Sequence, residues 1–364
     1  PFSTSIEQEG VVLRAELLTR AGALEHETIM ARLQHGPFPS RAPAENIADL
    51  EAQLAANRRG VALLRSLCER YGVQVVEAYM GHIQDDACAA VTSAIAALPD
   101  GSSTATEHLD DGTALAVRID VCGAEMTIDF AGTAPAHAGN LNAPRAVTVA
   151  CVLYVLRALV GTEIPLNQGC LTPVRIRVPP GSLLDPPPQA AVAAGNVETS
   201  QRVVDMLLRA LGLAAASQGT MNNLSFGGND WGYYETIAGG AGATESGPGA
   251  DAVHTHMTNT RITDPELLER RYPLRVERFA VRRGSGGEGT HSGGDGVVRR
   301  LRTLEPLTVS MISGRREVGA PGLAGGASGR PGENLIDGAT VGGSFIRELP
   351  ADSTLEVRSP GGGG

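Results

Sequence analysis

The stretch ATEHLDDGTALAVRIDVCGAEMTIDFAG, residues 105–132, marks the point where the chain changes from helical to strand-like periodicity. Apolar and polar residues alternate along it, as in strands that bury one face. Gly112, which follows two aspartates, and Gly123 are turn signals that divide the stretch. The sequence therefore predicts a three-stranded antiparallel meander between residues 104 and 130.

Two helical segments are predicted before the meander. Apolar residues recur at helical spacing from residue 47 to 71 and again from 75 to 95. Gly72 and the Pro-Asp-Gly run at 99–101 are expected to end these helices, and we expect the pair to form an antiparallel helical hairpin. The stripes consist of Ile47, Leu50, Leu54, Val61, Leu64, Cys68 and Tyr71, followed by Val75, Tyr79, Ile83, Ala87, Ala90 and Ile95.

The chain after the meander divides into an apolar part and a Gly-rich part. Residues 143–160 are apolar on nearly all sides, which predicts a buried helix, and residues 199–213 predict a second. From residue 215 the sequence indicates short strands and glycine turns, with one helix within 264–273 that Asp264 and Pro265 open. The glycine clusters fit tight turns, or close approach of the backbone to a ligand.

Together these segments predict an α+β fold. An N-terminal helical hairpin and β-meander would pack on a Gly-rich, mostly antiparallel β region. We expect three parts: residues 1–45 as a strand and turn segment, 46–214 as the hairpin, meander and buried helices, and 215–364 as the Gly-rich β region with pocket-lining motifs.

Composition excludes several classes of function. The net charge of −10 argues against nucleic-acid binding, and no apolar run is long enough to span a membrane. The chain contains no lysine, which excludes Schiff-base chemistry and a phosphate-binding Walker lysine on it. Its five cysteines are scattered and odd in number, which favours reduced thiols in a cytoplasmic protein.

The segment HTHMTNTR, residues 254–261, concentrates polar side chains. On a strand, His254, His256, Thr258 and Thr260 would share one face. A His-x-His pair can bind a metal, but a site needs a third ligand. The candidates, without diagnostic spacing, are His137, His291, Asp230 and Glu235. The alternatives are a polar substrate wall and an ordinary polar strand.

Other polar residues also have two interpretations. Asn140, Asn142 and Asn167 flank a predicted buried helix, where they could cap turns and bond to backbone or could recognise an amide. Glu235 lies in an apolar, aromatic stretch, where burial would make it an acid/base candidate, whereas a salt bridge to an arginine is the structural alternative. The Gly-rich run at 284–296 is followed by strand-like sequence, so it does not fit a phosphate loop.

Several long segments, in this order, resemble the hydantoinase B / 5-oxoprolinase family. They include DFAGTAPAHAGNLNAP, PLNQGCLTPVRIRVPPGSLLDP, the region from HTHMTNTR to RRGSGGEG, GGDGVVRRLR, GRPGEN and the final SPGGGG. The resemblance covers the chain from about residue 40 onward. It implies an ATP-dependent hydrolase of cyclic amides that acts by phosphorylating the amide oxygen and then opening the ring.

The resemblance also implies partners and cofactors. ATP and Mg would bind a hydantoinase A-like ATPase subunit, and a transition metal (Zn, Mn or Fe) is expected on a segment N-terminal to residue 1 or on a separate chain. No metal ligand is assigned to this chain. It would supply catalytic residues His256 and Glu235. The substrate-binding residues would be Asn140, Asn142, Asn167, His254, Thr258, Asn259 and Arg261.

Two other functions stay open at this point. A related subunit of a ketone carboxylase would use the same phosphorylation to activate bicarbonate and an enolised ketone. A non-catalytic scaffold is the third possibility. The sequence does not separate them.

Overall fold

The computed structural model describes residues 1–228 and 231–364. The chain opens with a 3₁₀ turn, Ile6–Glu9, and a small hairpin of β1 (Thr19–Arg20) and β2 (Ala23–Leu24). Helix α1 (His26–Gln34) then packs against the start of α2 (Pro43–Tyr71), where Ile29, Leu33 and Ile47 form a small buried core.

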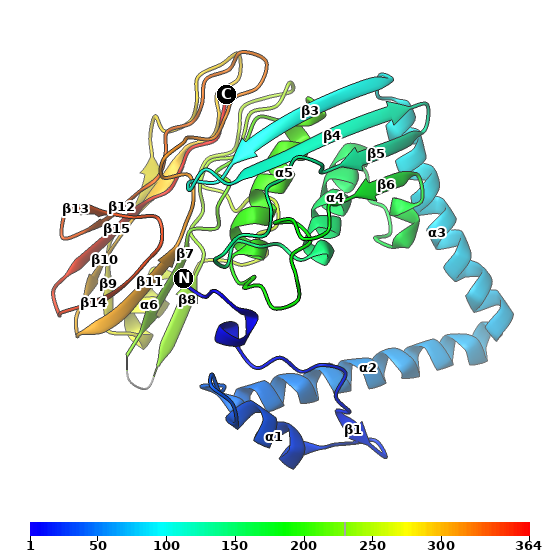
Figure 1. The fold of residues 1–364 in the computed structure, drawn as a ribbon, viewed down its shortest axis with the longest axis horizontal. Coiled ribbons are helices and arrows are strands. Elements are labelled where there is room, and N and C mark those ends of the chain that lie inside the picture. Colours follow the sequence, from blue (N-terminus) through cyan, green and yellow to red (C-terminus); the bar gives the residue numbers. More distant parts are fainter. Residues whose placement is uncertain (229–230) are drawn as a thin grey trace.

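Helices α2 and α3 (Val73–Ala96) occupy the predicted segments, separated by Gly72. They do not pack along their lengths as a close hairpin would. Gly72 has φ +87° and ψ 143°, so the chain turns a corner there and α3 leaves at an open angle (Figure 1). Only the last turns of α3 are buried, through Ala87, Val91 and Ile95. The apolar stripes before residue 84 consequently remain largely exposed.

The predicted meander is confirmed. Strands β3 (Gly101–His108), β4 (Ala114–Cys122) and β5 (Glu125–Asp129) pair antiparallel, and β6 (Val174–Arg177) adds parallel to β5. Alternate residues of β4 are buried, as the sequence pattern required. Helices α4 (Arg145–Val160) and α5 (Ser200–Ala210) pack on this sheet (Figure 1) and form its core.

The C-terminal half contains two sheets, one of five strands in the order β13-β12-β15-β10-β9 and one of four in the order β14-β11-β7-β8. Every pairing in them is antiparallel. A second core lies between them, and the predicted helix α6 (Pro265–Arg271) begins at Asp264, which accepts a bond from the Glu266 N–H. The strands are β7 (Asn223–Gly227), β8 (Gly232–Glu235), β9 (Leu274–Arg282), β10 (Gly296–Thr303), β11 (Leu307–Ile312), β12 (Glu333–Ile336), β13 (Ala339–Val341), β14 (Phe345–Leu349) and β15 (Thr354–Arg358).

The glycine clusters serve a purpose that the sequence did not indicate. The terminal run Gly361–Gly364 is buried and bonds to backbone from several segments: the Gly362 N–H donates to the Gly294 carbonyl, and the Gly363 N–H to that of Ala216. A Cβ on Gly362 would lie 1.9 Å from the Ala241 oxygen. Many of these glycines thus permit close contact between backbone segments.

The α+β fold class is confirmed. Three separate apolar cores lie in the N-terminal segment, in the meander with its helices, and in the Gly-rich half. The first of these cores includes Ile47, beyond residue 45, and the expected division at about residues 45 and 214 stays a prediction. Among the described residues, no helix is long and apolar enough to cross a membrane.

Candidate functional site

The segment 254–258 is a turn in the structure, so the predicted strand face is wrong. The Thr258 N–H donates to the Thr255 carbonyl at 3.1 Å, and His256 has φ +50°, in the left-handed region. This conformation costs a residue with a Cβ about 1–2 kcal/mol. His254, His256 and Thr258 therefore point in directions that a strand would not give, and the cost at His256 has to be offset by its contacts.

Those contacts come from the two core helices. His256 Nε2 lies 2.8 Å from Asp205 Oδ1 on α5, and its Nδ1 lies 3.4 Å from the Tyr154 hydroxyl on α4. The Tyr154 and His256 rings meet edge to face, with centroids 5.6 Å apart. Asp205 is fully buried, whereas Tyr154 is 37% exposed. The three side chains thus form a line from the interior to the surface.

The proton positions follow from the acceptors. The Asp205 carboxylate can only accept, so His256 carries its proton on Nε2 when neutral, which leaves Nδ1 as a proton acceptor toward Tyr154. Burial, followed by the charge of Asp205, raises the pKa of Tyr154, so its hydroxyl stays protonated at neutral pH. This geometry suits proton transfer at His256 Nδ1.

Gln201 lies one helical turn before Asp205 on α5 and contacts the same turn. Its Nε2 donates to Thr258 Oγ1 at 3.1 Å. Three buried polar atoms around this turn have no hydrogen-bond partner within the described chain: Gln201 Oε1, His254 Nδ1 and Thr255 Oγ1. Burial also lowers the pKa of His254, which favours its neutral form. Unpaired buried polar atoms are costly, and a polar ligand or water would satisfy them.

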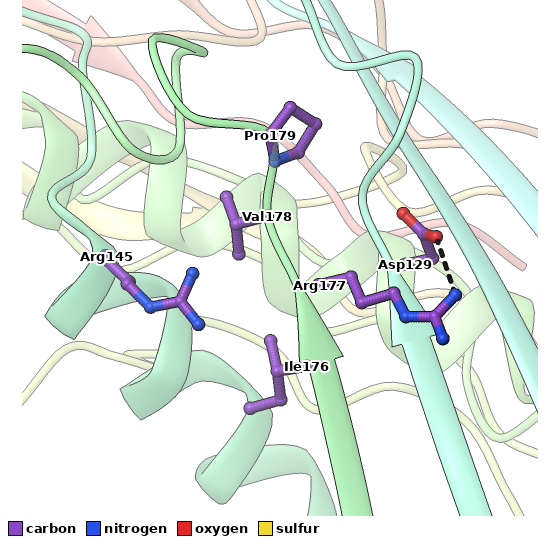
Figure 2. Close-up of a pocket in the computed structure, with 6 residues that line it drawn as sticks. All are labelled: Asp129, Arg145, Ile176, Arg177, Val178 and Pro179. Carbon is purple, nitrogen blue, oxygen red and sulfur yellow. Dashed lines mark ion pairs between the residues drawn. The ribbon is translucent and has the colours of Figure 1, made fainter.

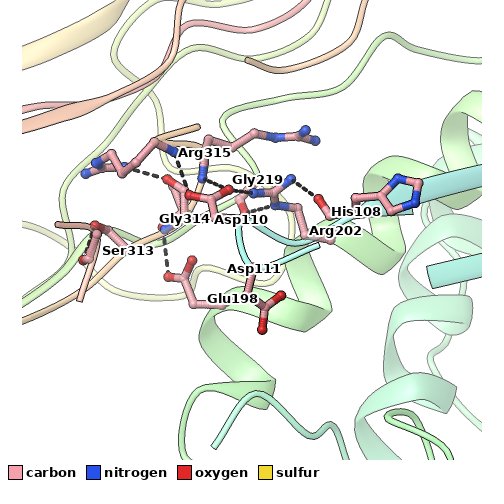
Figure 3. A network of polar contacts seen from close by, with 12 residues as sticks. His108, Asp110, Asp111, Glu198, Arg202, Gly219, Ser313, Gly314 and Arg315 are labelled. Atoms are coloured by element: carbon pink, nitrogen blue, oxygen red, sulfur yellow. Dashed lines mark hydrogen bonds and ion pairs between the residues drawn. The ribbon is translucent and has the colours of Figure 1, made fainter. Parts of the chain in front are cut away.

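A buried ionic cluster supports Asp205 from behind. Arg315 Nη2 lies 3.5 Å from Asp205 Oδ2, and the same guanidinium bonds to both oxygens of Glu107 at 3.0 and 3.2 Å. Arg202 on α5 donates to Glu107 and also to Asp110. Figure 3 shows Arg202 beside Asp110. These arginines are at most 1% exposed. Arg315 thus places a positive charge against Asp205, on the oxygen that does not face His256.

Asp110 links the two halves of the molecule. It lies in the β3–β4 turn of the opening stretch, and its carboxylate accepts the backbone N–H groups of Arg315 and Arg316 at 3.0 and 2.7 Å. Arg315 itself has φ +57°. The predicted Asp-Asp-Gly turn therefore both reverses the sheet and fixes the arginine that faces Asp205.

Glu198 is a second buried titratable group beside the cluster (Figure 3). It lies in a π-helical turn, Gly195–Thr199, which leads into α5. Burial raises its pKa to about 8, although bonds from Thr220 and the charges of Arg202 and Arg316 oppose the shift. Gly195 in this turn packs against the backbone carbonyl of Asn142. A Cβ at residue 195 would lie 2.0 Å from that oxygen, so this packing requires glycine there.

The three predicted amide-recognising asparagines bond to backbone instead. Asn142 donates to the carbonyls of His137, Gly139 and Ala191, Asn140 donates to that of Pro1, and Asn167 caps a 3₁₀ turn by accepting from the Gly169 N–H. This is the structural alternative that the sequence offered. Their bonds lead away from the 254–258 turn.

Glu235 likewise adopts its structural alternative. Its carboxylate forms a two-pronged ion pair with Arg299 at 2.6 and 2.9 Å and accepts a bond from the Tyr233 hydroxyl. It lies in β8, at the second core, whereas His256 contacts the helices of the first. Asn259 and Arg261 are exposed just beyond the turn, so of the predicted residues only His254, His256 and Thr258 surround the unpaired atoms.

Sequence reasoning missed Tyr154, Gln201 and Asp205. A usable signal existed for two of them, because Gln201 and Asp205 are polar residues four positions apart, and so share one face of a helix that the sequence predicts. Tyr154 carried no such signal. It lies within an apolar run, where a tyrosine is ordinary.

No metal site is formed within residues 1–228 and 231–364, where no group of three His, Cys, Asp or Glu side chains is placed to hold an ion. His256 is committed to Asp205, and His254 stands without a second ligand among the described residues. Asp230, a candidate third ligand, lies outside the described residues. The described residues therefore do not fit a transition metal.

A separate pocket of about 400 Å³ opens beside β6 (Figure 2). Arg145, Arg177 and Asp129 are its charged residues, with Arg177 and Asp129 3.9 Å apart. The Arg177 side chain is 60% exposed. Its charged groups are thus loosely held, unlike those behind His256.

Fold and site together define an α+β chain with a histidine-centred polar site over a buried ionic cluster. The model of the family Hydantoinase B/oxoprolinase matches residues 1–364. The chain is 43% identical to 5-oxoprolinase 1 of Arabidopsis thaliana over 396 residues, covering 100% of this chain and 31% of that protein. It is 41% identical to the 5-oxoprolinase of Saccharomyces cerevisiae over 406 residues, covering 100% of this chain and 31% of that protein.

Two solved structures share the fold. An ATP-dependent caprolactamase from Pseudomonas jessenii matches 98% of this chain and 66% of its own, with a TM-score of 0.84 and 22% identity. A nucleotide-free acetone carboxylase matches 100% and 57%, with a TM-score of 0.81 and 16% identity. This chain belongs to the Hydantoinase B/oxoprolinase family. It spans about a third of the length of the 5-oxoprolinases that it matches.

Proposed function

We propose that this chain is part of an ATP-dependent hydrolase of cyclic amides, of the hydantoinase and 5-oxoprolinase type. Family membership and 43% identity to a 5-oxoprolinase support the reaction class. The observation that carries the assignment to a site is the Tyr154–His256–Asp205 line, in which a strained histidine is held between a buried carboxylate and a partly exposed hydroxyl.

Ring opening needs the proton chemistry that this line offers. Water would add to the carbon of the O-phosphorylated amide, and the C–N bond would break as the nitrogen takes a proton. A second water would then release the phosphoryl group of the resulting acyl phosphate as inorganic phosphate. His256 Nδ1 would accept the water proton, directly or through the Tyr154 hydroxyl, and later deliver it to the leaving nitrogen. Asp205 would stabilise the imidazolium in between.

Substrate recognition would come from the unpaired atoms around the turn. Gln201 Oε1 can accept a bond from a ring N–H, and Thr255 Oγ1 can donate to a carbonyl oxygen. Cyclic amides carry both groups side by side. His254, Thr258, Asn259 and Arg261 complete this wall in our proposal. Arg261 lies at the exposed edge, where it would meet a charged substituent or phosphate.

ATP chemistry would take place outside this chain. We propose that ATP and Mg bind a hydantoinase A-like ATPase, either as a subunit or as another region of the same polypeptide, since the matched 5-oxoprolinases are about three times as long. A transition metal (Zn, Mn or Fe), where the enzyme uses one, would bind a segment N-terminal to this chain. ATP hydrolysis is therefore expected only when the ATPase is present.

A ketone carboxylase is the second candidate, because acetone carboxylase shares the fold. The hydrolase is favoured, since likeness at 16% identity extends to the fold alone, whereas the 5-oxoprolinases are far closer in sequence. Release of phosphate that depends on bicarbonate and a ketone, and not on a cyclic amide, would reverse this choice.

The test uses the complete enzyme with ATP and either 5-oxoproline or a hydantoin. His256→Gln should lower kcat at least about tenfold, about 1.4 kcal/mol of barrier, with little change in melting temperature. Tyr154→Phe keeps the ring contact and should change the pH profile of kcat. His35→Gln at the exposed end of α1 is the matched control. Unchanged turnover in His256→Gln, or loss only in step with unfolding, would show the line to be structural.

A further inference from the structure

The cavity beside β6 lies where three elements of one crossover meet. Strand β5, helix α4 and strand β6 follow one another along the chain, and β5 and β6 pair in parallel. Asp129 ends β5, Arg145 begins α4 and Arg177 ends β6. In α/β folds, ligands commonly bind at the carboxyl ends of parallel strands. All three residues line the cavity, whose volume of about 400 Å³ is within the range of small-molecule sites.

Arg145 has no acidic partner in this cavity or beside it. Its side chain forms no ion pair with any residue in 1–228 or 231–364, and it is exposed. It stands in the first turn of α4, which contains no acidic residue. A positive side chain is unfavourable there, because the helix dipole already places positive charge at this end. An anion in the cavity would offset both charges.

Arg177 and Asp129 lie on the other side of β6 (Figure 2). Their closest nitrogen and oxygen are 3.9 Å apart, beyond hydrogen-bond distance. Asp129 Oδ1 instead accepts a bond from the Ala131 N–H at 2.8 Å. The Asp129 carboxylate is thus held by its own turn and only loosely by Arg177. The cavity carries two arginines against one aspartate, a net charge of two minus one, or +1.

The rest of the lining is apolar and consists of Ile176, Val178 and Pro179. Figure 2 shows the Arg145 side chain directed toward Ile176 and Val178. A ligand that bonds to this guanidinium would therefore place its remaining atoms against apolar side chains. Guanidinium groups bind carboxylates through two parallel N–H bonds. The net charge of +1 matches a monoanion, whereas a phosphate dianion would leave surplus negative charge beside Asp129.

We propose that this cavity binds a small organic monocarboxylate. The carboxylate would bond to Arg145, its hydrocarbon part would cover Ile176 and Val178, and Arg177 would add attraction from across β6. The cavity is separate from the candidate active site. Tyr154 follows Arg145 by nine residues on α4, which corresponds to about 14 Å along the helix axis.

Isothermal titration calorimetry of the full-length protein with sodium hexanoate tests this site. Wild type should bind hexanoate saturably. Arg145→Gln should weaken that binding at least about tenfold, or about 1.4 kcal/mol, and Arg177→Gln by about threefold, because its charge acts from across the strand. Asp129→Asn should tighten binding, since it removes the negative charge while its amide oxygen can still accept the bond from Ala131.

Arg175→Gln is the matched control, because Arg175 is an exposed residue of the same strand that does not line the cavity. It should leave the affinity for hexanoate unchanged. His256→Gln should do the same, which separates this cavity from the proposed reaction. Hexanol lacks the carboxylate and inorganic phosphate lacks the hydrocarbon, so each should bind at least about tenfold more weakly than hexanoate.

Unchanged melting temperatures would confirm that the variants are folded. Three results would overturn the proposal. The first is the absence of saturable hexanoate binding by wild type, and the second is an equal loss of affinity in Arg175→Gln and Arg145→Gln. The third is an affinity for phosphate or hexanol equal to that for hexanoate, which would point to a general anion site or to a purely apolar one.

Discussion

Replacing Gly362 with alanine tests whether the C-terminal glycines are required for backbone contact. The added Cβ would lie 1.9 Å from the Ala241 oxygen, whereas ordinary contact begins at 3.4 Å. The backbone at Gly362 or at Ala241 would have to move by about 1.5 Å, the difference between these two distances. Neighbouring segments hold the backbone at both positions, so neither can move freely.

The loss in the free energy of unfolding follows from the backbone hydrogen bonds that this movement would break. Gly362 donates to the Gly294 carbonyl at 2.9 Å and accepts from the Gly287 N–H at 2.8 Å. Each buried bond contributes about 1 kcal/mol, and forced overpacking costs about 1–3 kcal/mol. We therefore expect Gly362→Ala to lower the free energy of unfolding by about 3–5 kcal/mol, a large part of the stability of a typical domain.

Urea unfolding followed by the fluorescence of the only tryptophan, Trp231, measures this change, because Trp231 packs against the second core. Gly247→Ala is the control: it lies in the same Gly-rich region, and a Cβ there would meet nothing within 4 Å. It should stay within about 0.5 kcal/mol of wild type. If Gly362→Ala is equally mild, the glycines are not needed for backbone packing.

Three further predictions concern titratable groups. Glu235→Gln leaves Arg299 charged and buried, so it should destabilise the protein by about 3–5 kcal/mol, whereas Glu277→Gln, in a more exposed pair with Arg302, should have a much smaller effect in the same urea titration. Burial raises the pKa of Glu198 in the folded state to about 8, above the usual 4.5, so the folded state binds this proton more tightly than the unfolded state. The stabilisation from this proton is fully present below pH 4.5 and is lost as the pH rises to about 8. Glu198→Gln should flatten that part of the stability profile, and an unchanged slope would refute the shift. Asp205→Asn removes the carboxylate that faces His256 Nε2, so it should lower kcat of the complete enzyme at least about tenfold; an unchanged kcat would contradict the role given to Asp205.

The sequence predicted elements where one periodicity dominated. The meander, the buried helices α4 and α5 and the capped helix α6 all lie where alternation, all-round apolarity or an Asp-Pro start placed them. Each of these signals is local, because it depends on residues within one strand or a few helical turns. The order of strands in the two C-terminal sheets had no such signal.

The site divided along the same line. Periodicity could mark HTHMTNTR as polar but could not show that His256 would adopt a left-handed turn, because Asp205 and Tyr154, which hold it there, are 51 and 102 residues away. Asn142 and Glu235 each had a structural and a functional interpretation. The same amide or carboxylate group would serve in either one. Only the backbone carbonyls around Asn142 and the guanidinium of Arg299 decided between them.

The glycines show the same limit in the backbone itself. The sequence alone determined that most of the 46 glycines lie in the second half of the chain, where they widen the range of backbone conformations available. It also determined the strands and turns of the meander. Two features depended on segments far apart in the chain: which glycine carbonyl faces which N–H, and which apolar residues of α2 and α3 stay exposed. Such contacts are set by the packing of the whole fold, which no window of sequence contains.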